Sequence, residues 1–140
     1  MNDTITGKQP LRTRPARSRD TDFFWHGLKE HKLLLQKCSA CGEMRHPPTP
    51  VCPTCHSFEI EYVESTGKGT VYTYTVHHYP PIPGFTAPFA VVVVDLEEGV
   101  RMVTWLTGVK PDELKLGMPL EVAFDDVTPE VSLPKFRRAA

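Results

Sequence analysis

The sequence predicts a mainly β fold, and three observations lead to this prediction. All four cysteines of the 140-residue chain lie in two Cys-x-x-Cys hooks between Cys38 and Cys55, with ten residues separating the hooks. After residue 66 the chain is rich in Val, Thr and Tyr, which favour strands. One brief helical segment interrupts these strands. We therefore expect a short N-terminal helix, a rubredoxin-like zinc ribbon and a small OB-fold barrel, in that order.

Composition and charge limit the classes of function. Sixteen basic and seventeen acidic residues give a net charge of −1, which argues against a general binder of phosphate backbones. No stretch reaches the length that spans a bilayer, and the N-terminus lacks the apolar run of a signal peptide, so we expect a cytoplasmic protein. The expected parts are a flexible basic tail or linker at 1–19, the helix and zinc ribbon at 20–65, and the barrel with a C-terminal tail at 66–140.

A short amphipathic helix is predicted from about residue 20 to residue 30. Asp20 or Thr21 can cap it, and Asp22 is favourable in its first turn. Its apolar side chains exceed what a small metal ribbon can cover, so we expect a partner protein or a substrate to contact them, with packing on the chain's own ribbon as the alternative. The candidate contact residues are Phe23, Phe24, Trp25 and Leu28.

The two hooks predict one tetrahedral metal site. Zinc is expected, because a closed site of four sulfurs matches its coordination and serves a structural role, although the ligands alone also suit iron. Two disulfides are the alternative, but two-residue spacers are typical of metal knuckles and nothing points to export. Strands at 33–37 and 58–63 flank the hooks and complete the ribbon. The expected ligands are Cys38, Cys41, Cys52 and Cys55.

The second half reads as a series of short strands. They are expected at 70–79, 89–96, 100–106 and 120–124, with a fifth from about residue 131, and with a helical turn within 110–117. The run Val91–Val94 indicates a strand buried on both faces, and Trp105 is expected in the core. The proline-rich loop at 79–85 exposes Ile82 and Phe85, which we add to the candidate contacts with a partner or substrate.

Together these segments resemble the DUF35 family, the zinc-ribbon OB-fold proteins associated with acyl-CoA metabolism. The resemblance covers about residues 20–125. It is carried by the helix that begins near Phe23, the paired hooks, the strand that starts Gly67-Lys68-Gly69-Thr70-Val71, and the loop at 80–85. In that family the domain commonly accompanies thiolase-like enzymes. In steroid-degrading bacteria a similar domain, fused behind a hot-dog hydratase module, supports a thiolase-like aldolase that cleaves a side-chain acyl-CoA.

The resemblance implies a non-catalytic accessory subunit or domain. A thiolase-like enzyme would be its partner in a hetero-oligomer and would bind most of the acyl-CoA substrate, while this chain contributes to the partner's stability and to the substrate entrance. Residues 1–19 would suit a linker behind an upstream domain. The residues themselves agree, since they show no paired acid and base, no activated nucleophile and no open metal position. We therefore expect no turnover by this chain alone.

Two other classes of function stay open from the residues. An OB-fold nucleic-acid binder would use aromatic platforms, and Tyr72 and Tyr74 lie on one face of a predicted strand, although the net charge opposes this function. A rubredoxin-like electron carrier would hold iron at the four cysteines. Iron would make the protein red, whereas a zinc protein is colourless.

Overall fold

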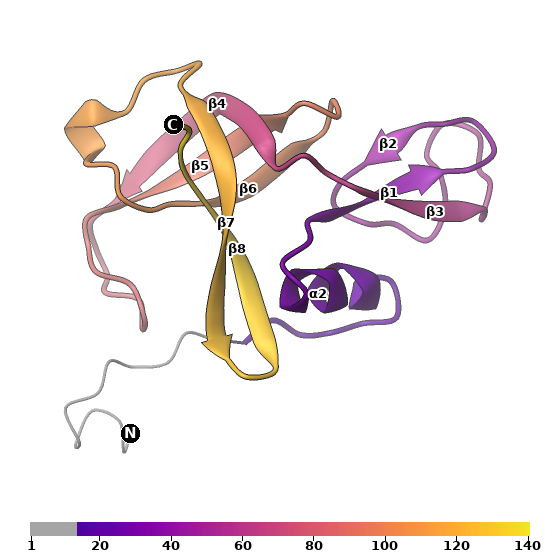
Figure 1. Ribbon diagram of the computed structural model, residues 1–140, viewed down its shortest axis with the longest axis horizontal. Coiled ribbons are helices and arrows are strands. Elements are labelled where there is room, and N and C mark those ends of the chain that lie inside the picture. The colour runs from indigo at the N-terminus through magenta and orange to yellow at the C-terminus, as the bar shows by residue number, and fades with distance from the viewer. Residues whose placement is uncertain (1–13) are drawn as a thin grey trace.

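The computed structural model describes residues 14–140, in which a short helix and a three-stranded sheet lie beside a closed five-stranded barrel (Figure 1). Of the basic segment predicted at 1–19, positions 1–13 lie outside the described residues. In the described part of the chain, no helix combines the length and apolarity needed to cross a membrane.

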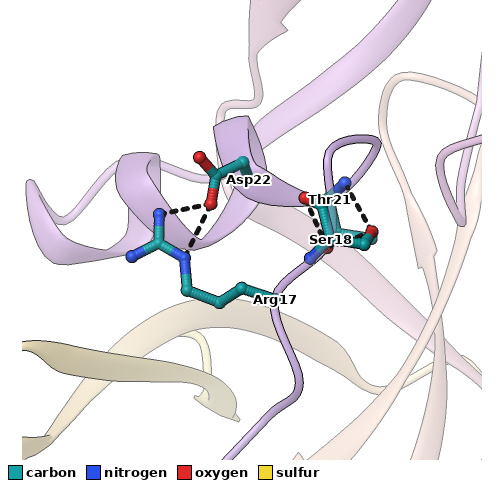
Figure 2. Close-up of polar contacts among 4 residues, drawn as sticks. All are labelled: Arg17, Ser18, Thr21 and Asp22. Atoms are coloured by element: carbon teal, nitrogen blue, oxygen red, sulfur yellow. Dashed lines mark hydrogen bonds and ion pairs between the residues drawn. The ribbon is translucent and has the colours of Figure 1, made fainter.

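Helix α2 (Asp22–Lys29) begins directly after Thr21. The Thr21 side chain makes no capping bond to the helix, contrary to the prediction; instead, the N–H of Ser18 donates to Thr21 Oγ1 at 3.1 Å and the N–H of Thr21 donates to Ser18 Oγ at 3.3 Å (Figure 2). Asp22 lies in the first turn and pairs with Arg17, whose Nη2 is 2.6 Å from Asp22 Oδ1. Both side chains are exposed, so this ion pair adds little stability.

The apolar face of α2 packs on two sides. Phe24 is 6% exposed and Leu28 is completely buried, so these two residues are core residues rather than the surface contacts that the sequence predicted. The sequence argument considered only the ribbon as a cover, whereas α2 contacts both β1 of the ribbon and β8 of the barrel. Gly27 allows the close approach to β1, because a Cβ there would lie 2.8 Å from the Leu34 side chain.

The ribbon is an antiparallel sheet in the order β2-β1-β3. Its strands are β1 (Leu34–Cys38), β2 (Met44–Arg45) and β3 (Ile60–Glu64). Gln36 of the central strand lies opposite Arg45 on one side and Tyr62 on the other. The two strands predicted beside the hooks are therefore present, each beginning one or two residues later than expected.

The barrel has the strand order β4-β5-β6-β8-β7 and closes through β4 and β7. All neighbouring pairs are antiparallel except β6 and β8, which are parallel. This connectivity is that of an OB fold, and the predicted helical turn is the 3-10 helix η1 (Pro111–Glu113) between β6 and β7. The strands are β4 (Lys68–His77), β5 (Phe89–Leu96), β6 (Arg101–Leu106), β7 (Pro119–Thr128) and β8 (Val131–Arg138).

Burial along β5 alternates. Val92 and Val94 are fully buried in the barrel, whereas Val91 and Val93 are only half-buried, which corrects the prediction of a strand buried on both faces. The reason is that a closed barrel turns one face of each strand inward and the other outward. Trp105 on β6 is likewise half-buried rather than in the core.

Polar contacts tie the ribbon half to the barrel at two places. Ser65 Oγ donates to Glu98 Oε1 at 2.7 Å, and the N–H of Thr66 donates to Glu98 Oε2 at 2.9 Å. At the other place, His31 Nε2 lies 3.0 Å from both carboxylate oxygens of Asp126. The Ser132 hydroxyl donates to Asp126, and this bond, followed by His31, lowers the pKa of that carboxyl group. These two sets of contacts therefore hold the ribbon half and the barrel in one arrangement.

Candidate functional site

The four cysteines converge at one end of the ribbon. Their Sγ atoms all lie within 4.8 Å of one another, with Cys38 Sγ 3.5 Å from Cys55 Sγ and Cys41 Sγ 3.6 Å from Cys52 Sγ. A tetrahedral ion with Zn–S bonds of about 2.3 Å needs sulfurs that are about 3.8 Å apart. The donor set and its spacing therefore fit zinc, with each hook supplying one buried and one exposed ligand.

The two hooks share one backbone conformation. The N–H of Gly42 donates to the carbonyl of Cys38 at 2.8 Å, and the N–H of His56 donates to the carbonyl of Cys52 at 2.9 Å. Both donors have a left-handed backbone, with φ of +82° at Gly42 and +62° at His56. The hooks are therefore structural equivalents, but only the first has glycine at its strained position.

The same turns favour a thiolate at one cysteine of each hook. A hydrogen bond from the backbone of Cys41 is the largest influence on Cys38 and contributes to lowering its pKa to about 6. The pKa of Cys52 is also lowered, mainly by a hydrogen bond from the backbone of Cys55. Since a metal binds the deprotonated sulfur, these backbone groups prepare the two buried ligands for coordination.

His56 offers a test of this equivalence. Replacing His56 with glycine is expected to raise the free energy of unfolding by up to about 1 kcal/mol, because an L side chain in the left-handed region costs about 1–2 kcal/mol and the added chain entropy of glycine offsets part of that gain. Denaturant unfolding of the zinc-loaded protein measures the change. The matched control, Gly42→Ala, should destabilise instead, and equal losses in both variants would contradict the equivalence.

A buried polar network fixes the loop between the hooks. Arg45 is 7% exposed, and its Nε donates to Gln36 Oε1 at 2.6 Å while its Nη2 donates to the carbonyl of Thr49 at 3.2 Å. Gln36 Oε1 also accepts from the N–H of Thr49 at 2.9 Å. The sequence argument missed this network, because a lone Arg and a lone Gln in neighbouring strands carry no distinguishing pattern.

The remaining candidate contact residues lie in different parts of the structure. Trp25 of α2 and Phe85 of the proline-rich loop line one cavity of about 360 Å³ that lies between α2, the 46–48 loop and the barrel strands β6 and β8. Phe23 instead stacks on Tyr62 of β3, with ring centroids 4.0 Å apart. Ile82 is 39% exposed on its loop. The structure thus brings Trp25 and Phe85 together and leaves Phe23 and Ile82 apart from them.

An exposed aromatic patch on the ribbon was missed by the sequence argument. Phe58 is 74% exposed and Tyr62 is 52% exposed, on the same side of the chain as Ile60. The alternation of these residues with Glu59 and Glu61 was a usable signal, but the sequence argument used it only to predict a strand of the ribbon. We call Phe58, Tyr62 and Phe23 the ribbon patch.

Two family models match the chain consecutively. The rubredoxin-like zinc ribbon domain of ChsH2 matches residues 25–61, and the C-terminal OB-fold domain of ChsH2 matches residues 62–125. The first match agrees with the sulfur geometry, so the four cysteines form a structural zinc site.

The similar proteins include longer curated proteins. The chain is 46% identical over 92% of its length to a probable enoyl-CoA hydratase alpha subunit of Thermomonospora curvata, and 48% identical over 81% of its length to the 3-oxo-4,17-pregnadiene-20-carboxyl-CoA hydratase alpha subunit of Mycobacterium tuberculosis. It spans only 40% and 36% of these two proteins.

One chain of a solved structure matches this chain over most of the length of both. A chain of the structure titled "Ltp2-ChsH2(DUF35) aldolase" superposes with a TM-score of 0.87 and is 46% identical, over 91% of this chain and 100% of that one. Sequence and backbone thus agree over most of the chain. The chain belongs to the DUF35 family and contains a zinc ribbon domain and an OB-fold domain that match those of ChsH2.

Proposed function

We propose that this chain is a non-catalytic accessory subunit or domain of a thiolase-fold acyl-CoA enzyme, and that this enzyme is an aldolase that cleaves a steroid side-chain acyl-CoA. One observation carries the proposal: the full length of a chain in the solved aldolase matches this chain at 46% identity. The accessory chain contributes to the stability of its partner and to the partner's substrate entrance. The partner binds most of the acyl-CoA.

The side chains that could support catalysis are otherwise engaged within the described residues. Zinc with four sulfur ligands has no open position for a water molecule or a substrate. His77 Nε2 lies 2.6 Å from the carbonyl oxygen of Pro80, and His31 is paired with Asp126 on the surface. Within residues 14–140, neither histidine is hydrogen-bonded to a nucleophile that it could activate. These arrangements support an accessory role.

The ribbon patch and the loop around Ile82 are the proposed docking surface. Phe58 and Tyr62 are large apolar side chains in solvent, and Phe23 extends their surface through its ring contact with Tyr62. Buried aromatic anchors dominate the energetics of protein interfaces. A thiolase-like partner that covers the ribbon patch would remove this apolar area from water, which gives the accessory chain a fixed position.

Complex formation tests the proposal. We expect the untagged chain to co-purify with a tagged thiolase-like enzyme encoded beside it, and Phe58→Ser combined with Tyr62→Ser to weaken the complex by about 30-fold or more, the loss of an anchor worth about 2 kcal/mol. Zinc content should not change, and the free energy of unfolding should fall only by the lost Phe23–Tyr62 ring contact, about 0.5–1.5 kcal/mol. Leu116→Ser, which also removes an exposed apolar side chain, is the matched control. Unchanged affinity in the double variant would place the docking surface elsewhere.

The other functions find less support. The guanidinium of Arg101 lies 3.6 Å from the centre of the Tyr72 ring, so this platform already carries a stacked group where a base would lie. Zinc has no redox chemistry, which removes the basis for an electron carrier. The cysteines form no disulfide, and we propose the cytoplasm as the location because reduced thiols persist there.

A further inference from the structure

The cavity shared by Trp25 and Phe85 has the dimensions of a small-molecule site. Its volume of about 360 Å³ falls within the range of about 300–1,000 Å³ that is typical of ligand pockets. One wall comes from α2 and the loop between the hooks, and the opposite wall comes from β6, β8 and the proline-rich loop. The site therefore exists only when the ribbon half and the barrel are assembled.

The residues that line the cavity disfavour a charged ligand. Besides Trp25 and Phe85, they include Met102, Trp105 and Leu133, and no Asp, Glu, Lys or Arg lines the cavity among the described residues. The hydroxyl of Thr104, which also faces the cavity, already donates to the carbonyl of Pro134 at 2.9 Å. A phosphate or carboxylate would lose its hydration there without gaining a partner, so the cavity suits an uncharged apolar molecule.

Two groups in the walls can nevertheless donate a hydrogen bond. Burial lowers the pKa of His46, so its imidazole is neutral at pH 7 and carries one N–H. Trp25 Nε1 is buried and has no hydrogen-bond partner among residues 14–140. An unsatisfied buried donor costs about 1–3 kcal/mol, and a ligand oxygen reached by a small rotation of the indole ring would recover part of that cost.

Aromatic contacts hold the walls in place. The Phe85 ring stacks on buried Phe89 with centroids 4.6 Å apart and meets Trp105 edge-on at 5.1 Å. On the other side, buried Phe24 meets Trp25 edge-on at 5.1 Å and lies 5.3 Å from the His46 ring. Such preorganisation lowers the entropic cost of binding.

We infer that this cavity binds an uncharged, mainly apolar molecule that contains a ring system and carries a hydrogen-bond-accepting oxygen. A ketone-bearing ring system has this chemistry, whereas the nucleotide part of coenzyme A does not. The identification of the ligand with the acyl part of the partner's substrate rests on the proposed function. The binding itself does not, because every wall belongs to this chain.

Tryptophan fluorescence of the zinc-loaded chain provides a direct test. Both tryptophans of the chain line the cavity, so a bound ligand should change the emission of each. With 4-pregnene-3,20-dione as the probe, we expect saturable binding of one molecule per chain, and a response from the remaining tryptophan in both Trp25→Phe and Trp105→Phe. Free coenzyme A should produce no response.

Variants locate the site and separate this inference from partner docking. Leu133→Phe overfills the cavity, and a cost of about 1–3 kcal/mol corresponds to binding that is about tenfold or more weaker. Leu116→Phe makes the same kind of enlargement at a residue that is 68% exposed and outside the cavity, and should change nothing. The inference is overturned by a lack of saturable binding or by indifference to Leu133→Phe. Neither of these results depends on whether the ribbon patch binds a partner.

Discussion

Replacement of Cys41 by serine is expected to unfold the zinc ribbon. The four Sγ atoms lie within 4.8 Å of one another, so loss of one thiolate removes a ligand from a site that is already closed. Structural zinc sites contribute about 10–16 kcal/mol of apparent binding free energy, which is shared with folding. We expect stoichiometric zinc in the parent, loss of tight zinc binding in Cys41→Ser, and collapse of the amide NMR signals of residues 34–64.

The neighbouring residue supplies the control for this experiment. Ser39 is exposed between the two cysteines of the first hook, and it donates a hydrogen bond to the carbonyl of Glu59 through its backbone N–H rather than its side chain. Ser39→Ala should therefore keep full zinc content and the parent spectrum. Retention of ribbon signals in Cys41→Ser after complete removal of zinc would contradict the view that metal binding and ribbon folding are one process.

Truncation of Leu28 to alanine is expected to have the next largest effect. This side chain is completely buried between the ribbon half and the barrel, and Leu→Ala changes at such sites cost about 2–5 kcal/mol through lost burial and the cavity left behind. Because α2 contacts both β1 and β8, the loss should lower the stability of both halves in denaturant unfolding.

Lys29 is the matched control, since it follows Leu28 in the same helix and is exposed. Lys29→Ala should change the free energy of unfolding by less than about 0.5 kcal/mol. If Leu28→Ala were equally mild and instead weakened a partner complex, Leu28 would be a contact residue and not a core residue.

Local patterns in the sequence were sufficient for the metal site and for most of the strands. The hook spacing places two sulfurs on one tight turn, and that geometry does not depend on the rest of the fold. The strand predicted at 89–96 coincides with β5. A proline before this run of β-branched residues and a Glu-Glu-Gly turn after it mark where the strand begins and ends. The order of helix, ribbon and barrel followed from the same signals.

Local sequence patterns could not predict which apolar side chains are exposed and which are buried. Whether Leu28 or Phe58 meets solvent depends on which distant strands lie against it. Leu28 is buried in a helix that contacts β1 and β8, whereas no described segment covers most of Phe58. The cavity had no sequence signature either, because Trp25, Phe85 and Leu133 come from three separate segments. Aromatic content correctly indicated unusual apolar surface, but not its position.

The contact between α2 and β8 also sets an order of events during synthesis. Residues 22–29 leave the ribosome before residues 131–138, the barrel strand that contacts them, have been made. The cysteine hooks are complete by residue 55 and can capture zinc in the nascent chain, whereas the side of α2 that contacts β8 stays uncovered until that strand emerges. Exposed apolar surface on a nascent chain attracts chaperones and other chains. Premature termination within β8 would therefore release a zinc-loaded but aggregation-prone polypeptide.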